Sequence, residues 1–204
     1  MAKIKYTKNE LKTQKDNLAR FRRFLPTLEL KKMQLIAEIR QIQEEMEYVR
    51  NEYNITEKNV GEWVGVFAED VDLKGFFEIE KVVLHYDNIA GINVPVFDTV
   101  LFKEKEYDLY RTPLWVDRGL NAVKVQIKRK AEIAVLGRKE EILGEELRIT
   151  VQRIKLFEEV KIPEALENIR VIQIFLGDQQ TAAVVRGKIA KTKIAKKKME
   201  ERIQ

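Results

Sequence analysis

Apolar side chains recur every three or four residues through the first third of the chain. In a heptad frame that starts at Leu11, nearly every first and fourth position up to Trp63 is apolar, and charged residues lie between them. Only Gln14, Lys32 and Thr56 interrupt this pattern. A period of 3.5 residues held this long indicates a coiled-coil helix, on the order of 80 Å long at 1.5 Å rise per residue. Its narrow apolar stripe needs a second helix as partner.

The expected partner is a helix that runs from about residue 114 to near the C-terminus. Thr112-Pro113 is typical of a helix start, because proline is tolerated at the first helical position. A second apolar seam follows, although it contains smaller and more polar side chains than the first. Its predicted members are Val123, Ile127, Ala131, Ala134, Leu143, Leu147, Thr150, Ile154, Phe157, Ile169, Ile172 and Leu176, followed by the smaller or polar Gln179, Ala183, Arg186 and Ala190.

Two prolines fall inside these helical patterns. Pro26 removes a backbone donor, so it predicts a kink or break near Phe24, yet the heptad frame continues unshifted across it. Pro163 predicts a second bend or a change of register. We therefore expect one bent helix at each end of the chain.

The middle of the chain has a different pattern. Two runs rich in β-branched and aromatic residues flank an Asn-Ile-Ala-Gly turn at residues 88–91, which predicts a β-hairpin at about residues 77–102. Pro95 must lie on an edge or at a strand end, because it lacks a ladder donor. We hypothesise that the segment Ile79 to Phe97 is a contact module and does not stabilise the helices.

These elements predict a mainly α fold, a long antiparallel two-helix coiled coil with a small β-hairpin insert. The expected organisation is an N-terminal coiled-coil helix at residues 1–63, a central insert at 64–113 and a C-terminal coiled-coil helix at 114–204. Antiparallel pairing places Leu11 opposite a residue between 165 and 180. About twenty C-terminal residues would then extend beyond the pair.

Charge is unevenly distributed along the 204 residues, whose formal net charge is +5. Residues 1–25 and 186–204 each carry eight basic and two acidic side chains, so the remainder is net acidic. We expect the basic segments to form one positive tip. That tip would suit phosphates of nucleic acid or lipid, an acidic protein surface, or simple solvation.

The sequence contains no pattern typical of catalysis or cofactor binding. It lacks the glycine-rich phosphate-binding loops, and it has no cysteine and one histidine, His85, so neither a metal site nor a cofactor is expected. His85 lies in a predicted strand, where a structural role is favoured. Paired carboxylates such as Glu44-Glu45 and Glu140-Glu141 fit a solvated helix face better than acid–base catalysis. Neither a signal peptide nor a membrane-spanning segment is predicted.

Several segments resemble the D subunit of the V/A-type (vacuolar and archaeal/bacterial) rotary ATPases. The most specific are Phe76-Phe77-Glu78-Ile79-Glu80 and the run from Asp87 to Phe97 with its Asn-Ile-Ala-Gly and Pro-Val-Phe elements. Further similarity lies in Arg153–Phe157 ahead of Ile162-Pro163, in Phe175–Asp178 and Arg186–Lys191, and more loosely in Pro26–Lys32. Together these segments cover nearly the whole chain.

The resemblance implies a non-catalytic central-stalk subunit, the rotor shaft that couples ATP hydrolysis or synthesis to proton or sodium transport by rotation. The implied partners are the catalytic A and B subunits, the F subunit and a membrane-side collar subunit, with no nucleic acid and no membrane insertion. The implied location is cytoplasmic, peripheral to the membrane within a membrane-bound complex. The alternative is a basic coiled-coil adaptor for nucleic acid or an anionic membrane surface, and an enzyme with an unrecognised site is a third hypothesis.

The shaft hypothesis assigns contact roles to two sets of residues. The expected contacts with the A/B hexamer are Arg22, Arg23, Arg186, Lys188, Lys191, Lys196, Lys197 and Lys198. The expected contacts of the insert are Ile79, Val82, Ile89, Gly91, Pro95 and Phe97.

Overall fold

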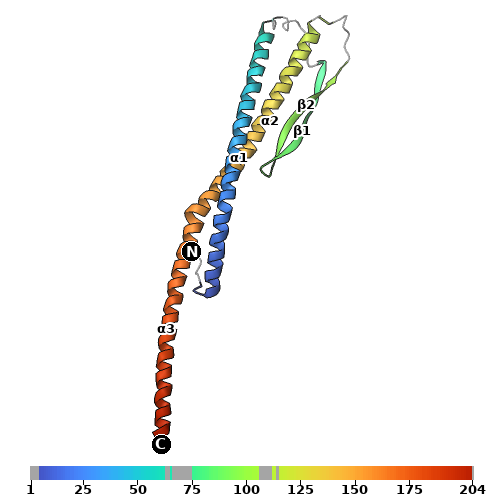
Figure 1. Cartoon of the computed structure of the whole chain (residues 1–204). Coiled ribbons are helices and arrows are strands. Elements are labelled where there is room, and N and C mark those ends of the chain that lie inside the picture. Colours follow the sequence, from blue (N-terminus) through green and yellow to red (C-terminus); the bar gives the residue numbers. More distant parts are fainter. Residues whose placement is uncertain (1–4, 63–64, 66–74, 106–111, 114, 204) are drawn as a thin grey trace. The chain divides into compact units, whose positions relative to one another are not determined.

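The computed structural model describes residues 5–62, 65, 75–105, 112, 113 and 115–203, with side chains as far as residue 196. The chain forms two compact units, one of Met1–Glu29 with Val151–Gln204 and one of Leu30–Thr150. We call them the terminal unit and the central unit. The predicted fold class is confirmed: the chain is mainly helical, with one small antiparallel sheet in the middle (Figure 1).

Helix α1 spans Lys8–Gly61 and is continuous through Pro26. Pro26 lacks a backbone N–H and so removes one hydrogen bond from this helix of 54 residues. The loss of that single bond does not end the helix. Thr7 immediately precedes the helix, and its hydroxyl accepts a hydrogen bond from the Glu10 N–H at 3.2 Å and so caps the first turn.

The core of the central unit lies between α1 and α2, which spans Val116–Lys155. The predicted α1 seam is confirmed, since its members Leu35, Ile42, Met46 and Val49 are all buried. Opposite them Leu136 and Leu143 are buried on α2. Ala134, predicted for this seam, is exposed, and the larger Leu136 is buried in the core instead.

Polar contacts along the central unit establish that the two helices are antiparallel. Lys31 donates to Glu146 at 2.8 Å, Gln43 to Glu140 at 2.6 Å, and Arg129 pairs with Glu52 at 3.4 Å. As the residue number rises along α1, the residue number of the partner on α2 falls, which is the order of an antiparallel pair.

The insert is a β-hairpin, as predicted, formed by β1 (Phe77–Ile89) and β2 (Ile92–Glu104). Its two-residue turn is Ala90–Gly91, whose φ angles of 51° and 83° are both left-handed, as in a type I′ turn. Two register shifts, between Ile79 and Lys81 and between Val83 and Leu84, interrupt the ladder.

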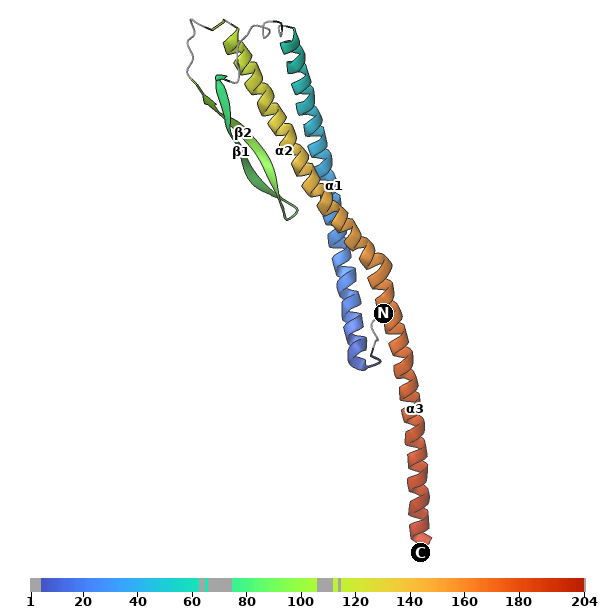
Figure 2. The ribbon, with the colours of Figure 1, turned by 180° about the vertical axis from the view of Figure 1, so that it is seen from behind.

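The hairpin belongs to the core, so the hypothesis that it does not stabilise the helices is wrong. Val94 on β2 is fully buried and clusters with Leu35, Ile42, Leu136 and Leu143. The hairpin runs beside α2 in both views (Figures 1 and 2), and at its base Lys124 lies over the Phe77 ring and Lys128 over the Phe102 ring. Helix α2 therefore buries surface against α1 and against the hairpin.

In the terminal unit the C-terminal helix contains a wider turn. A π-helical segment, η3 (Leu156–Lys161), separates α2 from α3 (Ile162–Ile203). The Ile162 N–H donates to the Phe157 carbonyl, a five-residue step instead of the four of an α-helix. The irregularity predicted at Pro163 thus takes the form of a π-helix that ends just before it.

Helix α3 pairs with the first part of α1 in antiparallel order. The rings of Tyr6 and Phe175 lie 5.1 Å apart, and those of Phe21 and Phe157 lie 5.2 Å apart. Between them, the Asn168 amide donates to Gln14 at 3.5 Å. This order places Leu11 opposite the stretch between Asn168 and Phe175, within the predicted window of 165 to 180.

The first prediction tests the left-handed turn. Gly91→Ala should lower the free energy of unfolding by about 1 kcal/mol, because an added Cβ opposes the φ of 83° although nothing lies within 4 Å of it. Gly144→Ala in α2, which also has nothing within 4 Å, should raise stability by about 0.5–1 kcal/mol through helix propensity. Urea unfolding of both variants measures the difference, and equal effects would contradict the turn geometry.

The second prediction tests whether the hairpin stabilises the central unit. Val94→Ala should cost about 2 kcal/mol, because it leaves a cavity in the core that α1, α2 and β2 share. Val82→Ala, at a β1 position that is 37% exposed, is the matched control and should cost less than about 0.5 kcal/mol. Similar losses in urea unfolding would restore the view of the hairpin as a separate module.

Candidate functional site

The predicted hexamer-contact residues fall on two separate stretches of the terminal unit. Arg22 and Arg23 are exposed on α1, next to Phe21, whose ring contacts Phe157. Arg186 lies far along α3, on the order of 40 Å from that level at 1.5 Å per residue. The structure therefore does not bring the two arginines to the C-terminal basic residues, and the single positive tip expected from the sequence is two basic stretches.

The second stretch belongs to a helix without a partner in the described chain. We call residues 177–203 of α3 the α3 overhang; every side chain described in it, 177–196, is exposed. Helix α3 continues past the start of α1 in both views (Figure 2). Arg186, Lys188, Lys191 and Lys196 lie on it, and the side chains of Lys197 and Lys198 lie outside the described residues.

The α3 overhang also exposes apolar side chains. They alternate with the basic residues, so a partner surface would need both acidic and apolar positions. The exposed members are Val184, Val185, Ile189 and Ile194.

The predicted insert residues divide between the surface and the core. Ile79 and Val82 on β1 are exposed, and Gly91 is exposed at the turn. Ile89 packs against the core cluster, and Pro95 is buried. Phe97 is half-buried. Ile79, Val82 and Gly91 are therefore the exposed members of this set, while Ile89 and Phe97 offer only part of their surface.

Sequence reasoning missed other exposed apolar residues of the hairpin. Leu84 and Tyr86 follow Val82 at alternate positions of β1, and Leu101 lies on β2; all three are exposed. The register shift after Ile79 keeps that residue on the side of Val82, Leu84 and Tyr86. The alternation of apolar residues was visible in the sequence, but the shift in register was not.

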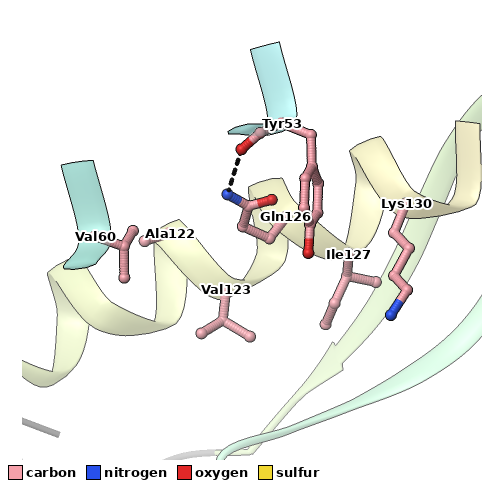
Figure 3. Close-up of a pocket in the computed structure, with 7 residues that line it drawn as sticks. All are labelled: Tyr53, Val60, Ala122, Val123, Gln126, Ile127 and Lys130. Atoms are coloured by element: carbon pink, nitrogen blue, oxygen red, sulfur yellow. Dashed lines mark hydrogen bonds between the residues drawn. The ribbon is translucent and has the colours of Figure 1, made fainter. Parts of the chain in front are cut away.

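A shallow apolar groove lies between α1 and α2 in the central unit. It has a volume of about 220 Å³ and is lined by Tyr53 and Val60 from α1 and by residues of α2 (Figure 3). The Gln126 amide donates to the Tyr53 carbonyl at 3.2 Å, while the Gln126 Oε1 is buried without a hydrogen-bond partner. A groove of this lining can take an apolar side chain but offers no nucleophile beside a base. The lining from α2 is Ala122, Val123, Gln126, Ile127 and Lys130.

Several exposed carboxyl groups are held in the ionised form by neighbouring cations. Hydrogen bonds from Arg148 and Arg170 lower the pKa of Glu145 and Glu167, and one from Lys105 lowers the pKa of Glu78. A general acid needs the opposite shift. The only histidine, His85, shares a 2.8 Å contact between its Nδ1 and the Asp98 Oδ1 on the exposed hairpin surface.

The part of the chain that the structure describes contains no group of three or more His, Asp or Glu side chains that could hold a metal ion. Within the same residues, no helix is both apolar enough and long enough to cross a membrane. The features that remain for function are the basic α3 overhang, the apolar β1 surface and the groove between α1 and α2.

Comparison with known proteins agrees with these features. The sequence model for the D subunit of ATP synthase matches residues 10–192. The D subunit of the V-type ATP synthase of Borreliella burgdorferi is 46% identical over 97% of this chain and 98% of its own length. That of Chlamydia caviae is 34% identical over 98% and 97%, and that of Chlamydia pneumoniae 33% identical over 96% and 95%. The chain therefore belongs to the ATP synthase D-subunit family, as the D subunit of a V-type ATP synthase.

Proposed function

We propose that this D subunit is the non-catalytic central shaft of its rotary complex. Its paired helices would transmit rotation between the catalytic A and B subunits and the membrane sector, and so couple ATP hydrolysis or synthesis to proton or sodium transport. The observation that carries the proposal is the α3 overhang, an exposed basic and apolar helix that extends past its own partner helix in a family of ATP synthase subunits.

The architecture supports a mechanical role. A shaft must span a long distance with few breaks between its elements, and α1 supplies a single helix of 54 residues. It must also present different faces to equivalent catalytic sites, which a two-helix structure with basic stretches at different levels does. Each face would favour a different conformation of the A/B pair that it contacts, so that rotation shifts the populations of the three sites.

The proposal divides the chain's surfaces among partners. The basic residues of α1 and the α3 overhang would lie in the sleeve of the A/B hexamer. The hairpin, with Ile79 and Val82, would contact the F subunit or the membrane-side collar subunit. In such an assembly the D subunit would be attached to the membrane only through its partner subunits. Its location would therefore be peripheral, on the cytoplasmic side.

The third prediction tests the contact with the hexamer. The triple variant Lys188→Glu, Lys191→Glu, Lys196→Glu should bind a reconstituted A/B hexamer at least about tenfold more weakly at low salt, because three favourable charge contacts become repulsive. The loss should shrink as salt screens the charges. The same three positions changed to arginine keep the charge and are the control.

Two outcomes would contradict the shaft proposal at this surface. One is unchanged hexamer binding by the charge-reversed chain at every salt concentration. The other is recovery of DNA or anionic vesicles, and not of A, B and F, when the tagged chain is mixed with all of them, which would favour the basic adaptor hypothesis.

The fourth prediction tests the hairpin surface. The double variant Ile79→Ser, Val82→Ser should weaken binding of the F subunit or the collar subunit by about tenfold, because the interface would bury two fewer apolar side chains. Glu80→Ser, between them on β1, is the control and should bind as the parent does. Unaltered binding of both partners by the double variant, with helicity intact by circular dichroism, would remove the hairpin from the contact surface.

A further inference from the structure

The apolar seam of the C-terminal helices contains one residue too many. Up to the first turn of η3 the seam positions are Leu143, Leu147, Thr150, Ile154 and Phe157, with the usual alternating steps of three and four. After it they are Ala165, Ile169, Ile172 and Leu176, with the same alternation. The step from Phe157 to Ala165 exceeds a heptad by one residue, and η3 lies in that interval. The π-helix thus absorbs the extra residue that keeps both halves of the seam on α1.

The π-helix depends on the proline that follows it. In an α-helix, residue 163 would donate its N–H to the Glu159 carbonyl, but Pro163 has no N–H. The preceding Ile162 N–H bonds five residues back, to the Phe157 carbonyl. Pro163 lacks an N–H in either form, but in an α-helix its ring would also clash with the Glu159 carbonyl, and the wider π turn relieves that clash.

A continuous α-helix would give α3 a different register on α1. Without the wider turn, α3 would rotate by about 100°, the angle of one residue in an α-helix. The residue before each seam position would then occupy the seam. Val171 and Phe175 would replace Ile172 and Leu176, and all four are apolar. Glu164 and Asn168 would replace Ala165 and Ile169, which makes this second register the less favourable one.

The pairing in the terminal unit is light enough to permit such a change. Among the described residues 5–29 no side chain is buried, and among residues 162–196, the part of α3 with described side chains, only Ala165 and Ile172 are. Phe175, which would enter the second seam, is 39% exposed and already contacts Tyr6. The contact between Gln14 and Asn168 is polar and long, so little apolar surface would be exposed during the rotation.

We propose that η3 is a register switch, in which conversion between π- and α-helix seats α3 on the N-terminal part of α1 in two alternative registers. The switch rotates α3 about its axis by the angle of one residue, about 100°, and so changes the direction in which its exposed charged side chains point. It acts within the terminal unit and leaves the α1–α2 core unchanged. It needs no partner protein, so it is tested on the isolated full chain, apart from the proposed shaft function.

Cysteine pairs distinguish the two registers, because the chain contains no cysteine of its own. Gln14→Cys with Asn168→Cys reports the observed register, in which the Asn168 Nδ2 lies 3.5 Å from the Gln14 Oε1. Gln14→Cys with Glu167→Cys reports the second register, in which residue 167 takes the place of 168. The fraction of intramolecular disulfide in each pair is measured after equilibration in a glutathione buffer.

Three backgrounds make this fifth prediction decisive. In the parent both disulfides should form, with the Asn168 pair in excess. Pro163→Ala removes the ring that clashes with the Glu159 carbonyl in the α form and should shift the ratio toward the Glu167 pair by about fivefold or more, because the α form is then no longer disfavoured. Pro26→Ala adds a donor to α1 and not to α3, so it is the matched control and should leave the ratio unchanged. Deletion of Glu159 removes the extra residue and should leave only the Asn168 pair.

The outcomes separate the switch from simple fraying. No Glu167 disulfide in either the parent or the Pro163→Ala background would overturn the proposal. Equal Glu167 disulfide with and without Glu159 would also overturn it, because end fraying does not depend on the π-helix. Should Pro163→Ala lose its helicity by circular dichroism, the comparison between the parent and the Glu159 deletion still decides the question.

Discussion

The antiparallel register of α1 against the C-terminal helices is the constraint on which the other features depend. In the central unit it is held by burial of Leu35, Ile42 and Leu143, and in the terminal unit by ring contacts and one amide pair. Because a coiled-coil seam repeats every 3.5 residues and an α-helix every 3.6, any extra residue must be absorbed locally. The π-helix η3 absorbs it, and both halves of the seam stay on α1.

Burial is distributed unequally between the two units, and this distribution fits their proposed tasks. The central unit has a three-sided core, since Val94 of the hairpin joins the residues of α1 and α2. The terminal unit buries little of its own surface, which leaves exposed side chains for other subunits. Stability therefore resides mainly where the hairpin packs, and contact surface mainly where α3 extends.

The sequence predicted the seam well, because four of its α1 members are buried and the heptad pattern is long enough to exclude chance. The hairpin was predicted from its β-branched runs and its glycine turn. Burial of Val94 was not, since strand alternation alone does not say which face meets the helices. A bend or a change of register at Pro163 was predicted, but the π-helix was not, because local propensities do not distinguish a bend from an inserted residue. The split of the basic residues into two stretches follows from the axial rise of α3, which a count of charges along the sequence does not include.

The α3 overhang poses a physical problem that assembly would solve. No described side chain of residues 177–196 is buried, so packing does not stabilise the helix there. Isolated helices of this length are marginal in water, and basic residues three or four apart repel each other. The hydroxyls of Thr181 and Thr192 donate to the carbonyls of Gly177 and Lys188, in the previous turn of the same helix. An acidic sleeve with apolar positions would neutralise the charges and bury Val185 and Ile189 in the same step. Binding to the hexamer and helix formation in the α3 overhang would then be thermodynamically linked. Weakening one interaction with the sleeve would lower the helical population of the α3 overhang and so weaken the other interactions as well.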